Sequence, residues 1–426
     1  MHDRFSLSWD TILLLILMTP HMWFNPASNA LVVVLLAVYV LLDIFGGDQG
    51  EVESSEASRR ERWLFLTRFA IVIFMVAVAV VLPTALNIIW RLQEGPATYA
   101  HDGLIQTEEA IKYILQGQNP YTEDYVNTPM ADFAGQEPPI TDLPLYHNPY
   151  LPFLFLVSIP AYWLSEMFMG WYDQRLLFLA AYFMTLLLLL GMVNGRRQQL
   201  TAIIAIGLNF LYAYYLADGR NDVMVLFGLV LTTVLLVKRH VALSAVVLGM
   251  TVMLKHSAWF FLPFYFVYLL PPGRLTMHSA RQLLRLTWPF LVTVALILIP
   301  FLLWDASALF DDTVAHIVGS GEDTLPIRGW GLSTLLLSFG VIPTPETDFP
   351  FIIFVLLLGL PTLYLTLRQQ WRHNTIQYMW VGFALFSFVM QFFSRFFNDN
   401  YFVFVLQALI IGHFARSDTF HTTTDH

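Results

Sequence analysis

The chain has 426 residues, of which 57% are hydrophobic and only 12% charged, and its mean hydropathy is positive. Soluble domains carry about a quarter charged residues, so this composition excludes an ordinary soluble protein and predicts an integral membrane protein. The absence of cysteine excludes disulfides, thiolate catalysis and cysteine-based metal sites. The net charge of −9 says little until the charges are placed by side of the membrane, and we expect no nucleic-acid partner.

Apolar stretches of membrane-spanning length recur along the whole chain. A helix needs roughly 20 apolar residues to cross a bilayer. The stretches that meet or approach this length are 7–24, 28–45, 64–92, 172–194, 199–217, 221–237, 241–255, 257–270, 286–304, 350–367, 376–393 and 399–415. The first has no small-residue cleavage site, so we expect it to be retained as a span and not removed as a signal peptide. The pattern predicts an all-α polytopic protein with about twelve transmembrane helices.

Two further apolar stretches, 149–169 and 331–343, are expected to lie along the outer leaflet or dip into it, because prolines interrupt the first of them. These would be juxtamembrane helices at the outer face.

The domain organisation follows from a polar linker of mixed charge before Trp63. Residues 1–62 are predicted to form a two-helix N-terminal preface with this cytoplasmic linker. Residues 63–415 form the main module, including the loop 93–148, and residues 416–426 a cytoplasmic tail.

Basic residues fall in alternate loops between the predicted spans. An excess of Lys and Arg marks cytoplasmic loops, and 15 of the 22 basic residues share one side: Arg4, Arg59, Arg60, Arg62, Arg68, Arg196, Arg197, Lys238, Arg239, Arg274, Arg281, Arg285, Arg368, Arg372 and Arg416. The opposite side receives loop 93–148, with nine carboxylates and one base, Lys112. We therefore expect a multi-pass protein of the plasma (inner) membrane, with both termini in the cytoplasm and this loop outside.

The outer loop contains a short amphipathic pattern, TEEAIKYILQG. Thr107 is a plausible N-cap, Glu108 and Glu109 fall in the first turn, and Gly117 ends the helix. We expect this helix to rest on the membrane surface, with its two glutamates compensating the helix dipole. Asp102 comes before the pattern, where capping does not need it.

Several segments in order resemble the membrane-embedded C-type glycosyltransferases. They are a first long span followed by an outward Asp102, a helix ending in GQNPY, then YHNPYLPFLF, DQRLLFLAAYF, DGRNDVMVLFGLVL, LGMTVMLKHSAWFFLPF and SRFFNDNYF. The nearest group is glycosyltransferase family 87, the polyprenol-phosphate-mannose-dependent mannosyltransferase-like proteins. The resemblance covers about residues 63–415, and the order of the segments carries it, because no single motif is specific.

The resemblance implies a C-type fold and a cell-envelope enzyme that moves a hexose, such as mannose, from a polyprenyl-phosphate donor to an acceptor hydroxyl. The acceptor would be a glycan, a lipid or a protein, and membrane lipids would surround the enzyme. Asp102 matches the outward catalytic aspartate of the family and would be the general base. Glu108 or Glu109 would replace it if the register differs, and a loop residue making a local turn is the alternative for Asp102.

The departing phosphate needs cations, and basic residues are scarce near the outer side. Lys255 lies between two apolar stretches, at membrane depth, where a charge is a functional candidate by default. Arg220, Arg328 and Arg395 occupy short outward turns and are further candidates for the donor phosphate. The alternative for each arginine is snorkelling, or pairing with a neighbour such as Asp218, Asp222 or Asp399.

The remaining candidates are polar residues of the outer side. We expect the sugar or acceptor to be contacted by residues from this set: His101, Glu109, Tyr121, His147, Asp222 and His256. The histidines show no recognisable metal-ligand spacing, so we expect no cofactor; Mg²⁺ or Mn²⁺ on hard oxygen ligands near Asp102 is the alternative.

Two other classes of membrane protein remain open. A polymerase or ligase of lipid-linked oligosaccharides also uses lipid-linked sugar at the outer face, although its large loop tends to come late in the chain. A transporter or flippase of lipid-linked sugars tends to show paired repeats and midplane charges. Convergence of Asp102, Lys255 and the arginines on one outward cavity would favour the enzyme.

Overall fold

The computed structural model describes residues 7–21, 26–46, 55–134, 143–271, 276–318 and 325–420. These residues form helices almost throughout. In chain order the helices are α1 (Trp9–His21), α2 (Pro26–Gly46), α3 (Ser55–Val76), η1 (Ala77–Val81), α4 (Leu82–Glu94), α5 (Asp102–Leu115), α6 (Pro129–Ala134), η2 (Leu143–Leu145), α7 (Phe153–Met169), α8 (Arg175–Met192), α9 (Arg196–Gly207), α10 (Phe210–Asp218), α11 (Asp222–Val237), α12 (Val241–Val252), η3 (His256–Phe261), α13 (Leu262–Leu269), α14 (Met277–Phe310), η4 (Asp311–Ala315), α15 (His316–Val318), α16 (Leu332–Ser338), α17 (Phe351–His373), α18 (Ile376–Phe392) and α19 (Asp399–Phe414). Two short parallel strands, β1 (Arg328–Gly329) and β2 (Phe396–Phe397), pair with each other.

Four helical stretches are long and apolar enough to cross a membrane: Arg59–Glu94, Arg175–Met192, Met277–Val318 and Phe351–His373. A fifth results if α9 and α10, which meet at 50°, are taken as one broken span. The prediction of an all-α membrane protein is confirmed, because apolar helices of this length need a lipid environment.

The predicted count of about twelve spans is not reproduced. The stretches 7–24, 221–237, 241–255, 376–393 and 399–415 fold as helices of 13, 16, 12, 17 and 16 residues. The stretch 257–270 divides into the 3₁₀ turns of η3 and the short α13. Apolar runs therefore overstate helix length where a turn interrupts the backbone without interrupting the hydropathy.

The proline-containing stretch 149–169 forms a helix, as expected, although its prolines interrupt it less than the sequence suggested. Pro149 and Pro152 precede α7, and only Pro160 lies inside it, so one continuous helix of 17 residues forms. The other stretch, 331–343, contributes only the seven residues of α16.

Buried charges join the N-terminal helices to α3. Arg68 donates to Asp43 at 2.6 Å and lies 3.6 Å from Asp10, whose carboxylate also accepts a 2.6 Å hydrogen bond from Tyr39. Arg68 is thus a residue of the helix interface and not of a cytoplasmic loop. The predicted linker is also shorter than expected, because α3 already begins at Ser55.

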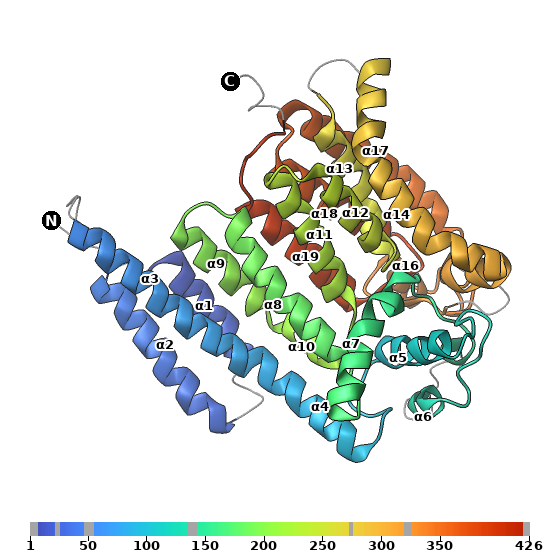
Figure 1. Ribbon diagram of the computed structural model, residues 1–426, viewed down its shortest axis with the longest axis horizontal. Helices are drawn as coiled ribbons and strands as arrows, with labels where there is room; N and C mark the ends of the chain where they lie inside the picture. Colours follow the sequence, from blue (N-terminus) through green and yellow to red (C-terminus); the bar gives the residue numbers. More distant parts are fainter. Residues whose placement is uncertain are drawn as a thin grey trace.

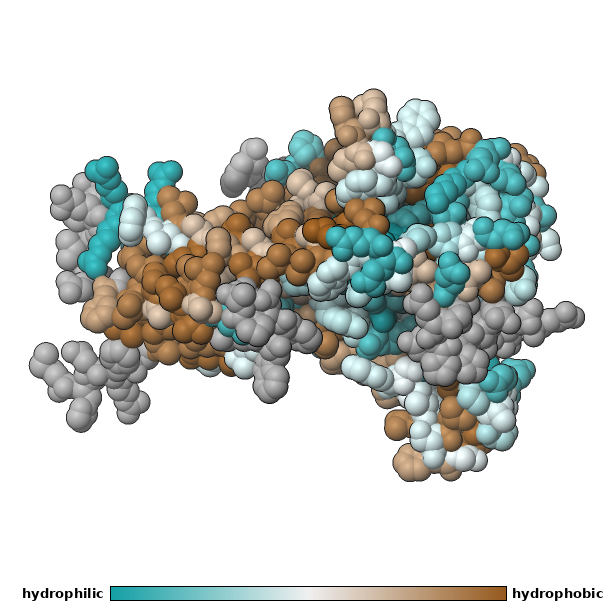
Figure 2. Space-filling view, turned by 90° about the horizontal axis from the view of Figure 1, so that it is seen from below, coloured by the Kyte–Doolittle hydropathy of each residue, from teal (hydrophilic) through white to brown (hydrophobic). Residues whose placement is uncertain are grey.

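The polar end of the molecule lies around α5. Figure 1 shows α5, α6 and α7 gathered at the lower right, with α1, α2 and α3 on the opposite, left side. In Figure 2 the part nearer the N-terminal helices is largely brown, whereas hydrophilic side chains gather on the right. On this face, hydrophilic side chains are most numerous on the right, although some also stand at the left end.

The helix that starts the outer loop is longer and more buried than its sequence indicates. It begins at Asp102 with His101 as N-cap, and Thr107 lies inside it, donating to the Gly103 carbonyl at 2.6 Å. Every residue from Gly103 to Ile111 is buried. The predictions of a surface helix capped by Thr107, with Asp102 outside it, are therefore wrong.

Candidate active site

A cavity of about 690 Å³ opens where α5, α17 and the ends of several other helices meet. The N-terminus of α5, the turn between α10 and α11, and the junction between α12 and η3 form its polar end. The predicted site residues that line it are His101, Asp102, Arg220, Lys255, His256, Arg328 and Arg395. Segments separated by up to about 300 residues of sequence are thus brought to one place, as expected of an active site.

Asp102 stands at the first position of α5, beside its cap. The Asp102 Oδ1 lies 2.6 Å from His101 Nδ1 and accepts a 2.5 Å hydrogen bond from the Gly103 N–H. Burial works to raise the pKa of Asp102, but His101, the nearby charge of Arg328 and the Gly103 N–H hold it well below its usual range. The carboxylate is therefore ionised throughout the neutral range.

Tyr150 closes the cavity over this carboxylate. A Cβ added at Gly103 would collide with the Tyr150 hydroxyl, so the ring lies directly against the first turn of α5. The charge of Asp102 contributes, after burial, to holding the pKa of Tyr150 well above its usual range. The phenol is therefore a neutral hydrogen-bonding group of the site.

Lys255 is not the lone cation that the sequence suggested. Its Nζ donates to Asp222 Oδ1 at 2.7 Å and to Asn221 Oδ1 at 3.0 Å, and it lies 4.9 Å from the centroid of the Tyr401 ring. Asp222 also accepts from Asn400. Both side chains of the ion pair are mostly buried, at 14% and 9% exposure. The pair presents almost no net charge to the cavity.

We expect Lys255→Ala to lower the free energy of unfolding by about 3–5 kcal/mol, because it leaves the Asp222 carboxylate buried and unpaired. The double variant Lys255→Ala/Asp222→Asn should recover most of this loss. Thermal unfolding of the purified protein in detergent, followed by tryptophan fluorescence, measures both. A single variant as stable as the wild type would show that the pair contributes nothing to the fold.

Arg220 is also paired, but at the open side of the cavity. It donates to Asp218 and to Asp399 at 3.0 Å each and to Asn400 at 2.9 Å. Burial works to lower the pKa of Arg220, but the neighbouring carboxylates raise it. The predicted alternative of pairing with Asp218 and Asp399 therefore holds for Arg220.

The Arg395 side chain binds the backbone of neighbouring segments and not a ligand. Among the described residues its guanidinium donates only to carbonyl groups, those of Leu325 at 2.5 Å, Thr347 at 3.0 Å, Pro345 at 3.2 Å and Glu346 at 3.3 Å. Removing it would release two segments that line the cavity. Arg395 therefore reads as a structural residue, and its proposed contact with a donor phosphate loses its support.

Arg328 is the cation of the cavity that remains available. Its side chain is exposed and makes no hydrogen bond or ion pair with any residue that the structure describes. The next residue, Gly329, has φ +97° and packs so closely on the Phe397 carbonyl that a Cβ would not fit. This contact fixes β1 against β2 and with it the position of Arg328, which can meet an anion bidentately.

Another part of the cavity wall is rich in apolar side chains and reaches the surface, although His316, Asp348 and Gln391 also line it. It contains Ile317, Val318, Phe349, Phe351, Ile352, Val355, Phe396 and Met390. Val318 at the end of α15 and Ile352 at the start of α17 are 63% and 60% exposed. Both belong to stretches long enough to span a membrane. The cavity therefore connects a charged end with an apolar mouth.

A buried network of charged side chains, which the sequence did not reveal, positions the segments that form the polar end of the cavity. Arg91 donates to Glu108 at 2.7 and 3.0 Å and to Asp173 at 2.9 Å. Arg175 also binds Asp173, and it donates to the carbonyls of Tyr99 at 2.7 Å and Ala217 at 3.0 Å.

The two carbonyls held by Arg175 precede Asp102 and Arg220 in the chain, so one guanidinium positions both segments. Glu108 is consequently a partner of Arg91 in the middle of a helix and not a first-turn residue that compensates a dipole. Only the scarcity of charges in the sequence could have drawn attention to Arg91 and Arg175.

Four predicted contacts do not line the cavity. Glu109 pairs with Lys112 at 2.6 Å, and the Tyr121 hydroxyl donates to the Tyr150 carbonyl at 2.8 Å. Asp222 forms an ion pair with Lys255, which does line the cavity. His147 Nδ1 lies 2.8 Å from Asp312 Oδ1, and its ring stacks on His316 at 4.3 Å.

Among the described residues, one set brings together three residues that could bind a metal, namely His147, Asp311 and Asp312, whose ligand atoms lie within 4.8 Å of one another. The two carboxylates suit Mg²⁺ or Mn²⁺, whereas the imidazole better suits a transition metal such as Zn²⁺, and none of the three residues belongs to the cavity lining. His101 and His256, by contrast, do line the cavity, on either side of the α10–α11 turn.

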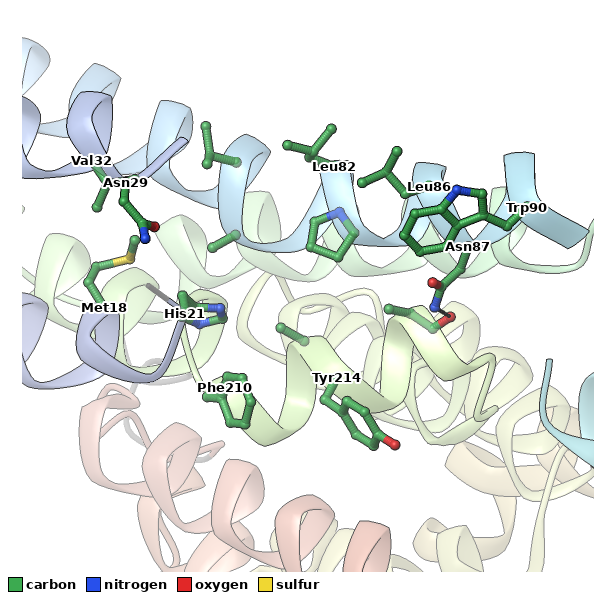
Figure 3. A pocket seen from close by; sticks show the side chains of 15 residues that line it. Met18, His21, Asn29, Val32, Leu82, Leu86, Asn87, Trp90, Phe210 and Tyr214 are labelled. Atoms are coloured by element: carbon green, nitrogen blue, oxygen red, sulfur yellow. Dashed lines mark hydrogen bonds between the residues drawn. The ribbon is translucent and has the colours of Figure 1, made fainter. Parts of the chain in front are cut away.

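A second, smaller cavity of about 260 Å³ lies between the N-terminal helices and α4 and α10. Figure 3 shows Leu82, Leu86 and Trp90 along its α4 wall, with His21 and Phe210 opposite. No carboxylate, lysine or arginine is among the described residues that line it. Acid–base and phosphate-binding groups are thus concentrated in the larger cavity.

The chain matches no protein-family model, and no curated protein or solved structure is significantly similar to it.

Proposed function

We propose that this protein is a membrane glycosyltransferase that moves a hexose from a polyprenyl-phosphate donor to an acceptor hydroxyl at the outer face of the membrane. Mannose is the sugar that the resemblance to family 87 favours. The observation that carries the proposal is the cavity itself, which joins the Asp102 carboxylate, Arg328, with which no described residue pairs, and an apolar mouth on membrane-length helices.

The charges of the cavity suit sugar transfer from a phosphate. The acceptor hydroxyl must lose a proton, and the ionised Asp102 with its partner His101 supplies the acid–base group. The departing phosphate gains negative charge, which Arg328 can stabilise with two parallel hydrogen bonds. Arg220 and Lys255 contribute less, because carboxylates already neutralise them.

The apolar mouth suits the lipid part of the donor. A polyprenyl chain entering between α15 and α17 would lie against Val318, Ile352 and Val355 while its phosphate reaches Arg328. A nucleotide-sugar donor would have no use for such a wall, since its base and ribose are polar. We therefore favour a lipid-linked donor over a soluble one.

The proposed architecture is the C-type bundle, in which the shorter apolar helices α11, α12, α18 and α19 pack against neighbouring helices. Most of α11 and about half of α12, α18 and α19 is buried, and helices with such protein contacts need not each span the whole bilayer. In this arrangement the loop 93–148 faces outward, and both termini face the cytoplasm.

The proposed orientation predicts opposite accessibility of two exposed positions in a chain with no cysteine of its own. Asn127→Cys lies in the outer loop, and Glu61→Cys lies in the basic first turns of α3. An impermeant thiol reagent should label Asn127→Cys in intact cells and Glu61→Cys only after the membrane is opened. Labelling of both before opening would overturn the orientation.

The direct test incubates the purified protein with a panel of radiolabelled polyprenyl-phosphate sugars and follows the label out of the lipid. Release that depends on an added glycan, lipid or protein acceptor supports the transferase. Growth of one lipid-linked chain by repeat units would indicate a polymerase instead. Movement of intact donor across a vesicle membrane without any cleavage would indicate a flippase.

A further inference from the structure

We infer that the His101 imidazole takes the proton from the acceptor hydroxyl, and that Asp102 orients and charges this ring without itself being the base. The inference deepens the proposed function and rests on it. It differs from the assignment that the family resemblance implies, in which the aspartate alone acts as the base.

The first support is the geometry of the pair. His101 Nδ1 and Asp102 Oδ1 are 2.6 Å apart, and the carboxylate accepts. The ring must therefore carry its proton on Nδ1, since two acceptors do not approach each other so closely. The Gly103 N–H then donates to Asp102 Oδ1, to which it lies closer (2.5 Å) than to the ring nitrogen (3.1 Å). This tautomer leaves a lone pair on Nε2.

The second support is the position of the remaining ring nitrogen. His101 lines the cavity, its side chain is 27% exposed, and its Nε2 makes no hydrogen bond to any residue of the described ranges. The backbone holds the ring in place, because the His101 N–H donates to the Asp218 carbonyl at 2.9 Å. A lone pair that is oriented, accessible and unpartnered is what a general base needs.

The third support is proton affinity. Even with a neutral His101, its hydrogen bond, the charge of Arg328 and the Gly103 N–H favour the ionised form of Asp102, so this carboxylate binds a proton weakly and alone would make a poor base at neutral pH. A neutral imidazole is matched to that range, and a carboxylate on its Nδ1–H stabilises the imidazolium that forms. The arrangement uses each group in the protonation state that its surroundings favour.

The proposed step balances as follows. The acceptor O–H bond breaks, and its proton binds His101 Nε2. The acceptor oxygen forms a bond to the anomeric carbon of the sugar while the bond from that carbon to the phosphate oxygen breaks. The electron pair leaves with the polyprenyl phosphate, whose added negative charge faces Arg328.

Other titratable groups face the same cavity and could in principle shape a pH profile. They come from every element around the pair, namely Tyr150 before α7, Asp218 and Arg220 at the α10–α11 turn, Lys255 and His256 at the α12–η3 junction, His316 on α15, Arg328 on β1, Asp348 before α17 and Tyr401 on α19. Of these, His256 and His316 are the histidines, so His256→Gln is included as a matched control.

The test measures the transfer rate at saturating donor and acceptor between pH 5 and pH 8. In the wild type we expect the rate to fall by up to about tenfold per pH unit towards the acid end of this range, as the base becomes protonated. His101→Gln should lower the rate at pH 7.5 by about 10²–10⁴-fold, and the rate of this variant should no longer fall with decreasing pH. The rate of His256→Gln should fall with decreasing pH as the wild-type rate does, over the same pH range.

Each outcome decides the matter. Two results would overturn the assignment of His101 alone: a wild-type rate that does not change down to pH 5, or a His101→Gln rate that still falls with decreasing pH. Asp102 would then be the general base. Wild-type protein that transfers no sugar from any lipid donor overturns the proposed function and this inference with it. The wild-type profile needs no variant, so it decides even if His101→Gln fails to fold.

Discussion

Replacing Asp102 with asparagine is expected to lower the rate of sugar transfer by about 10²–10⁴-fold while leaving donor binding nearly unchanged. The amide keeps the shape of the side chain and can still accept from the Gly103 N–H. It carries no charge, however, and can neither take a proton nor stabilise a protonated His101. The measurement is transfer rate alongside binding of the labelled donor lipid in the same detergent preparation.

The matched control is Glu109→Gln, which also replaces a carboxylate with an amide on α5 but lies about two helix turns from Asp102. Glu109 forms only the pair with Lys112 and does not line the cavity. Although Glu109 is buried, the change leaves unpaired only Lys112, whose side chain is 43% exposed and can be hydrated, so stability should change by at most about 1 kcal/mol and turnover should stay close to that of the wild type. If Asp102→Asn retains normal turnover while Glu109→Gln loses it, the acid–base group lies elsewhere on α5 and the proposed site is wrong.

Arg328→Ala is expected to lower the transfer rate by about 10²–10³-fold, the usual effect of removing one preorganised donor to developing charge. The protein should fold normally, because the side chain is exposed and has no hydrogen-bond partner in the described part of the chain. Arg328→Lys should recover only part of the rate, since an ammonium presents a point charge where the guanidinium presents a fork. Initial rates over a range of donor concentrations separate turnover from binding.

Arg372→Ala is the control for loss of one exposed arginine, because Arg372 lies at the far end of α17 and away from the cavity. It should leave the kinetics unchanged. Normal kinetics in Arg328→Ala would show that Arg328 does not meet the phosphate. Arg220 or Lys255 would then have to exchange its carboxylate partner for the donor, which the present pairing opposes.

The two functional halves of the cavity depend on one buried network. Arg175 binds the carbonyls of Tyr99 and Ala217, which precede Asp102 and Arg220. Asp173 and Arg91 continue the network to Glu108 on α5. Burying several charges is costly unless all are paired, and here the pairing fixes the acid–base pair relative to the α10–α11 turn.

The sequence by itself determined the class of the protein. Its apolar composition and its scarce charges required helices in a lipid environment, and the all-α membrane class is what the structure has. The sequence also identified most of the charged residues that line the cavity, among them Asp102, Lys255 and Arg328. This is because a polar residue beside a membrane stands out against its neighbours.

The partners of those residues were decided only by the tertiary structure. Lys255 meets Asp222 from 33 positions away, and Arg220 meets Asp399 from 179 positions away, so neither pairing follows from local spacing. The same holds for the start of α5, which burial and the His101 cap move forward to Asp102. The hydropathy of a residue indicates the free-energy cost of exposing it to lipid or to water. Whether a charged side chain is free to bind a ligand depends instead on which other charged side chain lies beside it in the folded protein.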